Sequence, residues 1–158
     1  MEQAFFYVDG IPSNGCWVEL NAAEGWGDII RALYDAGLKN PDEILCADAE
    51  GLARHFLSRY DSFDLAGYVA CREECTWASE EAKAAYIDCF GAWDAVAFED
   101  SYSGEWESDT ALAEDYIDST GLLTSMPDNL HGYFDTAAFT RDLMMDYSES
   151  GGHYFRNI

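Results

Sequence analysis

Two cysteines stand at a spacing that could begin a metal site. Cys71 and Cys75 are four residues apart, so a helix would place both thiols on one face. A structural zinc site needs four ligands, and His55, His131 and His153 are scattered through the chain. We therefore interpret these residues as free thiols and expect neither a metal nor a cofactor.

The carboxylates could serve other chemistry. The segment 100–105, Asp-Ser-Tyr-Ser-Gly-Glu, begins like a calcium loop. Tyr102 stands where an oxygen ligand belongs, however, and Glu105 stands where the loop requires Gly. Two carboxylates could hydrolyse a glycoside, but with 31 acids some pair lies at any chosen spacing. The sequence contains no phosphate loop and no Gly-x-Ser-x-Gly motif. We therefore expect no enzyme, and a carboxylate hydrolase is the weakest alternative.

The charge balance points to a binding partner. The 31 acids stand against 8 Lys and Arg, which gives a net charge of −23. Nucleic acids and anionic membranes are excluded as partners, because both require cationic side chains. Disordered acidic chains have few aromatic residues, whereas this chain has 5 Trp, 10 Tyr and 9 Phe. It is therefore expected to fold in spite of its self-repulsion.

The cysteines and the hydropathy indicate the compartment. The number of cysteines is odd, and their spacing shows no disulfide framework. A signal peptide has a basic segment followed by an apolar one, and the N-terminus shows no such pattern. No apolar run approaches the ~20 residues of a membrane span. We expect a cytoplasmic protein with reduced thiols.

Hydrophobic patterns and turn residues predict the secondary structure. Strands are expected at 3–9 and 16–20, joined by a turn over 10–15, and at 43–48 after an Asn40-Pro41-Asp42 turn. A helix over 26–36 would end at Gly37 and carry one apolar face, formed by Ile29, Ile30, Leu33 and Tyr34. Further helices are expected at 64–75, at 79–90 with Ser79 as N-cap, at 108–119 with Ser108 as N-cap and at 135–144 with Asp135 as N-cap. A last strand is expected at 153–156.

Changes in these patterns divide the chain into three units. The predicted domains are an N-terminal α+β domain over 1–60, a central, mainly helical domain over 61–100 and a C-terminal α+β domain over 101–158. Units this small bury little surface alone. The expected fold is therefore α+β, an elongated chain of three small domains with a strongly acidic surface, assembled as a dimer.

The acids concentrate in a window without bases. No Lys or Arg lies between Lys83 and Arg141. A solvated face normally mixes both signs of charge. In the helix around 114, one face is expected to be apolar and the opposite face acidic; the apolar residues are Leu112, Ala113, Tyr116 and Ile117, and the acids are Glu114, Asp115 and Asp118. Glu114 and Asp118 are four residues apart and repel by roughly 0.2–0.5 kcal/mol. Since B-DNA carries one charge per ~1.7 Å, 23 charges correspond to ~39 Å of duplex. We expect ten acids to imitate phosphates: Asp88, Asp94, Glu99, Asp100, Glu105, Glu107, Asp109, Glu114, Asp115 and Asp118.

Two segments of the last third carry a family resemblance. Residues 98–108, Phe-Glu-Asp-Ser-Tyr-Ser-Gly-Glu-Trp-Glu-Ser, are similar to a segment of ArdA proteins, Phe-x-Asp-x-Tyr-x-Gly-x-aromatic-x-Ser. Residues 122–143 resemble the antirestriction motif of that family. The matching motif residues are Pro127, Tyr133, Phe134, Asp135, Ala138, Phe139, Arg141, Asp142 and Leu143. In the first unit, 42–44, 47–48 and 50–51 are also similar.

The resemblance implies a function. ArdA proteins are curved, elongated homodimers of three-domain chains, joined through the third domain and encoded on mobile genetic elements. They inhibit type I restriction–modification enzymes by occupying the DNA groove of the methyltransferase core, without a cofactor or metal. The implied motif and dimer contact comprises Leu122, Leu123, Pro127, Tyr133, Phe134, Asp135, Phe139, Arg141, Asp142 and Leu143. The alternative is an acidic partner of another basic protein, such as a nuclease or a histone-like protein.

Overall fold

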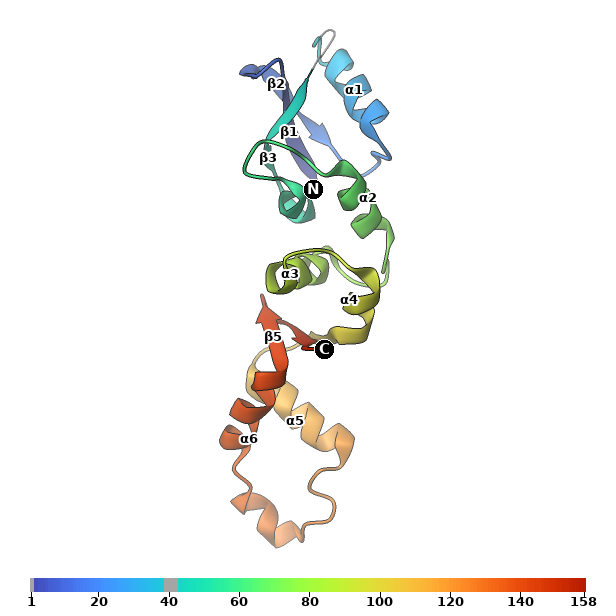
Figure 1. Ribbon diagram of the computed structural model, residues 1–158. Coiled ribbons are helices and arrows are strands. Elements are labelled where there is room, and N and C mark those ends of the chain that lie inside the picture. Colours follow the sequence, from blue (N-terminus) through green and yellow to red (C-terminus); the bar gives the residue numbers. More distant parts are fainter. Residues whose placement is uncertain (1, 39–42) are drawn as a thin grey trace.

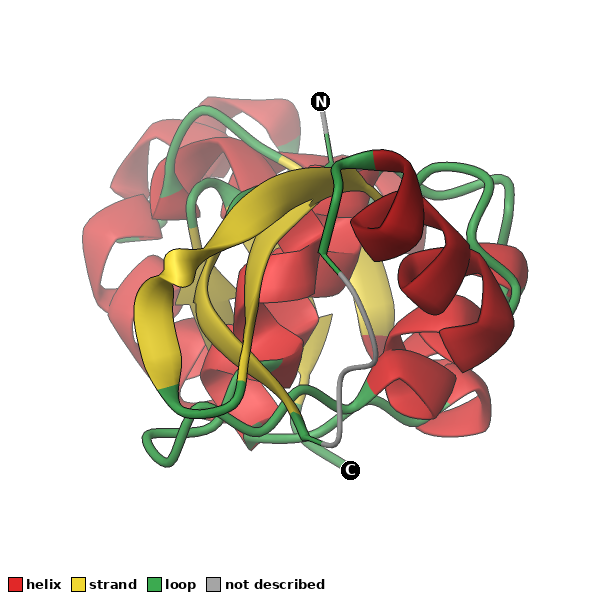
Figure 2. Cartoon of the chain, turned by 90° about the horizontal axis from the view of Figure 1, so that it is seen from above, coloured by secondary structure: helices red, strands yellow, loops and turns green. Residues whose placement is uncertain are grey.

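The chain has a mixed α+β fold with one small antiparallel sheet near each end of the sequence. The computed structural model describes residues 2–38 and 43–158. Its elements are spread along a single long axis, and after α6 the chain turns back so that the C-terminus lies near α4 (Figure 1). The outline seen along that axis is rounded (Figure 2). None of the helices in these residues is long and apolar enough to cross a membrane.

The first sheet has the order β2-β1-β3. Its elements are β1 (Gln3–Val8), β2 (Ile11–Glu19) and β3 (Ile44–Ala49), with α1 (Trp26–Asp35) between β2 and β3. Alternate residues of β1, Ala4, Phe6 and Val8, are fully buried, as expected for a strand with one face on a core. The predicted strands at 3–9 and 43–48 are confirmed. The predicted Asn40-Pro41-Asp42 turn lies outside the described residues.

The hairpin between β1 and β2 corrects a prediction. The turn consists of Asp9 and Gly10, both with positive φ (56° and 69°), and not of residues 10–15. An Asp-Gly pair is a favoured two-residue hairpin turn, because both positions then adopt left-handed conformations. Strand β2 therefore begins at Ile11, and Gly15 pairs with Tyr7 inside the ladder.

Helix α1 confirms most of the predicted apolar face. Ile29 and Leu33 are fully buried, but Tyr34 is 47% exposed. Each residue advances about 100° around a helix, so Tyr34 lies beyond the narrow stripe that faces the sheet. The prediction for this side chain was wrong.

The middle of the chain is helical, and side chains cap its helices. The elements are η1 (Gly51–Phe56), α2 (Leu65–Glu73), α3 (Glu80–Phe90) and α4 (Ala95–Ser101). Asp64, Ser79 and Asp94 each accept a hydrogen bond from the backbone N–H three residues later. The predicted helix over 64–75 ends at Glu73, because Glu74 adopts an extended backbone with ψ of 155°. Helix α4 was not predicted.

The second sheet and a helical arm complete the chain. The elements are β4 (Tyr102–Glu105), α5 (Asp109–Thr120), η2 (Asp128–Tyr133), α6 (Thr136–Leu143), η3 (Met144–Asp146), β5 (Tyr147–Ser150) and β6 (His153–Arg156). The sheet order is β4-β6-β5. The predicted caps Ser108 and Asp135 and the strand at 153–156 are confirmed. Strands β4 and β5 were not predicted.

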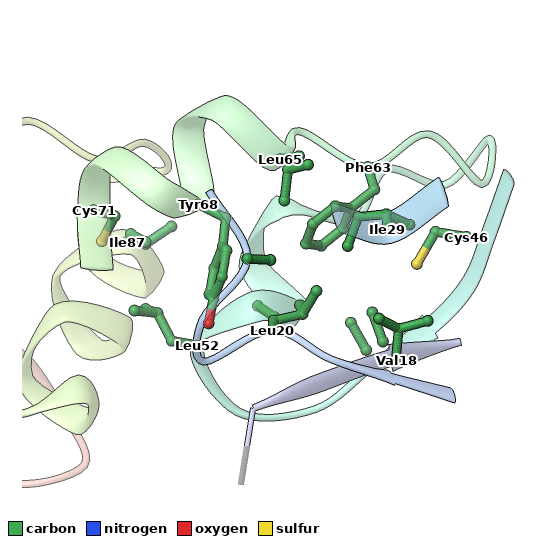
Figure 3. Packing of buried hydrophobic residues seen from close by; sticks show 14 of the residues in the cluster. Val18, Leu20, Ile29, Cys46, Leu52, Phe63, Leu65, Tyr68, Cys71 and Ile87 are labelled. Atoms are coloured by element: carbon green, nitrogen blue, oxygen red, sulfur yellow. The ribbon is translucent and has the colours of Figure 1, made fainter. Parts of the chain in front are cut away.

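One hydrophobic core runs through both sheets. It extends from Ala4 to Phe155 without interruption. Figure 3 shows Ile87 of α3 beside Leu52 of η1, with Tyr68 and Cys71 of α2 packed near them. Towards the second sheet, Tyr86 of α3 contacts the ring of Phe155 at a centroid distance of 5.5 Å. Helix α3 therefore connects the two sheets, and α5 and α6 extend beyond this core (Figure 1).

Candidate acidic interaction surface

All ten acids of the predicted set are exposed. They lie on segments that follow one another along the lower half of the rod in Figure 1, from α3 and α4 to α5. The set comprises Asp88, Asp94, Glu99, Asp100, Glu105, Glu107, Asp109, Glu114, Asp115 and Asp118. No hydrogen bond joins two of them. The set is therefore spread over several elements of the chain.

In helix α5, the spacing of the apolar residues places the acids on the exposed face. Ser108 begins the helix by accepting a hydrogen bond from the Ala111 N–H at 3.1 Å. Leu112, Ala113 and Ile117 are buried. Glu114, Asp115 and Asp118 therefore lie on the opposite, exposed face. The predicted acidic face of this helix is confirmed, although Tyr116, predicted on the apolar face, is 37% exposed.

Four of the ten acids have partners within the chain. Asp94 caps α4 through the Ala97 N–H at 3.0 Å. The Tyr154 hydroxyl donates to Asp109 at 2.7 Å, and burial together with this carboxylate raises the pKa of Tyr154. The remaining two are Asp88, paired with His55 Nδ1 at 3.5 Å, and Glu99, which accepts from the Cys75 thiol at 3.6 Å.

The other six acids have no hydrogen-bond or ion-pair partner among the described residues. They are Asp100, Glu105, Glu107, Glu114, Asp115 and Asp118. The ion pairs of arginine lie elsewhere, at Arg31, Arg72 and Arg141, and each joins a carboxylate close in sequence. Among the described residues, no ion pair neutralises the charge of these six carboxylates.

Two basic side chains are used inside the molecule, which the sequence did not reveal. Lys83 is 3% exposed, and its ammonium donates to the carbonyl oxygens of Cys71, Arg72 and Glu74 at 2.7, 3.2 and 2.6 Å. These carbonyls lie at the C-terminal end of α2, where a cation is favoured. The guanidinium of Arg72 donates to the Leu20 and Ala23 carbonyls at 2.7 and 2.9 Å. Lys83 is therefore removed from the surface, and Arg72 is partly buried.

The segment 122–145 is poorly buried for its apolar content. Thr140 is its one buried residue. Tyr133 is 87% exposed, Met145 is 72% exposed and Leu122 and Leu130 are 43% exposed. Such a row of exposed apolar side chains is characteristic of an interaction surface.

The structure places the ten predicted motif residues around this surface. Leu122, Pro127, Tyr133, Asp135, Arg141 and Asp142 are exposed, and Leu123, Phe134, Phe139 and Leu143 are half-buried. Asp135 caps α6 through the Ala138 N–H. Phe139 lies against both Phe134 and Tyr116, with centroid distances of 5.6 and 6.1 Å. Within this set, Asp135 therefore caps a helix, and Phe134 and Phe139 make packing contacts.

The thiols considered for a metal site do not come together as ligands. Cys71 is fully buried in α2, and burial raises its pKa to about 12. Cys75 lies beyond the end of the helix, and its thiol donates to Glu99. Within residues 2–38 and 43–158, no group of three or more His, Cys, Asp or Glu side chains could hold a metal ion.

Comparison with known proteins identifies one similarity over nearly the whole chain. The sequence model of the family described as antirestriction protein (ArdA) matches residues 7–155. No match to a curated protein sequence was found.

Proposed function

Because the chain belongs to the ArdA family of antirestriction proteins, we propose that its ten exposed acids imitate the phosphates of duplex DNA. Members of this family inhibit type I restriction–modification enzymes as DNA mimics and are not enzymes. The chain is therefore an antirestriction protein that binds such an enzyme. The finer proposal concerns the residues that carry this activity and the groove they occupy.

The proposal rests on the absence of internal partners for most of the exposed carboxylates. Six of the ten acids lack an internal partner among the described residues, and Lys83 and Arg72 bind backbone carbonyls. A basic groove that accepts DNA would attract such a surface by the same electrostatic steering. We propose that the occupied groove is that of the methyltransferase core, and that the protein acts in the cytoplasm, where this target meets DNA.

A competition titration tests this proposal. A purified type I methyltransferase is mixed with its labelled duplex, and the protein is added while bound DNA is measured by fluorescence anisotropy. Displacement that saturates near stoichiometric amounts is expected. Unchanged DNA binding across the titration would contradict occupation of the DNA groove by this protein.

We further propose a homodimer that forms through 122–145. The apolar side chains exposed there, among them Leu122, Leu130 and Tyr133, are of a kind that a symmetric interface buries. The division into domains at 1–60, 61–100 and 101–158 belongs to the same proposal, with the third domain as the joint between the two chains.

A further inference from the structure

A cavity of about 690 Å³ opens between two parts of the chain that are distant in sequence. Its walls come from the end of η1, from one side of α2 and from the loop that joins α3 to α4. Ligand pockets in proteins span about 300–1,000 Å³. The cavity is therefore large enough for a long side chain together with its neighbours in a bound protein.

Apolar and acidic side chains together line the cavity. Phe56, Leu57, Ile87, Trp93 and Val96 supply carbon surface, and Val96 is 70% exposed. The acids of the wall are Asp64, Glu74 and Asp94, and no Lys or Arg lines the cavity.

The three carboxylates are held in place and keep an oxygen free. Asp64 Oδ1 and Asp94 Oδ1 cap α2 and α4, and Glu74 Oε2 accepts from the indole of Trp93 at 2.8 Å. The second oxygen of each has no hydrogen-bond donor among the described residues. Lys83 lies behind the wall, 5.7 Å from the Trp93 ring centre, with its ammonium bound to carbonyls. The cavity therefore combines fixed acceptors with an apolar bed.

We propose that this cavity holds an arginine side chain of the bound target protein, with the guanidinium beside Glu74 and Trp93 and the stem along the apolar lining. Guanidinium suits the site because it is planar, weakly hydrated, rich in donors and able to stack on aromatic rings. The inference rests on the proposed function, because Asp94 belongs both to the cavity wall and to the acidic surface. Steering brings the target to that surface, and the cavity then slows its release.

The test uses a probe that does not depend on the target enzyme. N-acetyl-arginine methylamide is titrated into the protein while the Trp93 indole N–H signal is followed by NMR, and Trp93→Phe assigns that signal. N-acetyl-citrulline methylamide has nearly the same shape without the charge. We expect saturable shifts with the arginine compound and at least about tenfold weaker binding of the citrulline compound, because hydrogen bonds to charged groups are the stronger ones.

Three variants decide whether the cavity is the site. Ala70, an exposed residue of the α2 wall, becomes Phe and fills the cavity without changing the charge. Glu74→Gln removes the charge and keeps an oxygen that can accept from the Trp93 indole. If Ala70→Phe does not fold, Glu74→Gln alone tests whether the cavity is the binding site. Asp146→Asn removes an exposed charge outside the cavity. We expect the first two to weaken arginine binding about tenfold, and Asp146→Asn to leave it within about twofold.

Equal affinity for the two compounds, or parental affinity in the cavity variants, would overturn the proposal. The probe reports on the cavity alone, so failure of the competition titration would leave this result intact. In the complex with the methyltransferase, Ala70→Phe should raise the dissociation rate about tenfold with an unchanged association rate.

Discussion

Lys83 is buried, although the protein has only 8 Lys and Arg residues. Its ammonium satisfies three carbonyls at the turn between α2 and α3. In the sequence this lysine looks like one more surface charge. The burial of Lys83 depends on the packing of α3 against α2. The acceptors are backbone carbonyl oxygens, which the pattern of side chains in the sequence does not indicate.

Replacing Lys83 tests this contact. Lys83→Met removes the donor and leaves buried carbonyls unsatisfied, which we expect to lower the free energy of unfolding by about 2 kcal/mol. Arg54→Met is the matched control, since Arg54 is exposed and a surface change of this kind costs about 0.5 kcal/mol or less. Urea denaturation measures both. Equal unfolding midpoints for the two variants would show that Lys83 is not a structural contact.

A carboxylate pair makes stability depend on pH. Glu2 is 4% exposed and accepts from the backbone N–H groups of Leu52 and Ala53, both at 2.9 Å. Burial and the facing Glu2 carboxylate raise the pKa of Glu80. A raised pKa means that the folded state binds the proton more tightly than the unfolded chain. Stability from this group is therefore present at low pH and is lost as pH rises through the raised value.

Removing the charge of Glu80 should restore the stability that is lost as pH rises. We expect Glu80→Gln to be more stable than Glu81→Gln at pH 7 by about 0.5 kcal/mol, since the partly exposed pair is screened by solvent. Glu81 is the control because it occupies the same first turn of α3. Thermal unfolding between pH 4 and 7 measures the difference. An advantage that grew toward acid pH would contradict the assignment.

At the scale of elements, local signals predicted the helices well. Ser79, Ser108 and Asp135 each cap the helix that was predicted to follow them. A cap is a contact between near neighbours in sequence, so the sequence alone reveals it. The exposed acids of α5 followed from helical periodicity for the same reason. This part of the candidate site could be predicted without the structure.

The two strands that were missed depend on distant partners, whereas the missed helix α4 begins at a local cap, Asp94. Strands β4 and β5, Tyr-Ser-Gly-Glu and Tyr-Ser-Glu-Ser, are four residues long and contain no apolar run. They are strands because β6 lies between them. The cavity and the buried Lys83 likewise arise from segments brought together by folding. Local patterns cannot show such features.

Gly15 tests the corrected hairpin. A Cβ at this position would lie 2.5 Å from the Phe6 carbonyl oxygen and 2.8 Å from the Tyr7 Cβ. Because backbone atoms in a paired strand cannot move aside cheaply, we expect Gly15→Ala to destabilise the protein by about 2 kcal/mol. Gly27→Ala in α1 meets nothing within 4 Å and should stabilise by about 0.5–1 kcal/mol. Chemical denaturation that gave both changes the same sign would refute the register.

The whole molecule is a rod whose single core stops short of its last helices. Helices α5 and α6 extend past the second sheet (Figure 1), and the apolar residues of 122–145 are exposed or half-buried. The same end carries much of the unpaired acidity. Apolar contact therefore favours the association of two chains, and charge repulsion opposes it.

Sedimentation velocity tests the proposed dimer. We expect a dimer at micromolar concentration that tightens as salt is raised, because salt screens the repulsion between two chains of charge −23. Leu130→Glu with Tyr133→Glu should give monomers, and Ile11→Glu, at an exposed apolar residue of β2, should not. A parent that stayed monomeric under all these conditions would remove the dimer from the account.

The central claim is that distributed carboxylates, and no single residue, carry inhibition. Each exposed charge contributes about 1 kcal/mol or less, which is less than about sixfold in affinity. Glu114→Gln or Asp118→Asn alone should therefore change inhibition little. The variant that neutralises Glu105, Glu107, Glu114, Asp115 and Asp118 together should lower the association rate by about tenfold or more.

The decisive measurement is the association rate of the single, double and fivefold variants with a type I methyltransferase at two salt concentrations. Thr110→Ala with Ser119→Ala changes the same helix without changing its charge and serves as the control. We predict a graded decline that shrinks at high salt and a control equal to the parent. One carboxylate whose loss abolishes inhibition, or a fivefold variant as fast as the parent, would contradict the account.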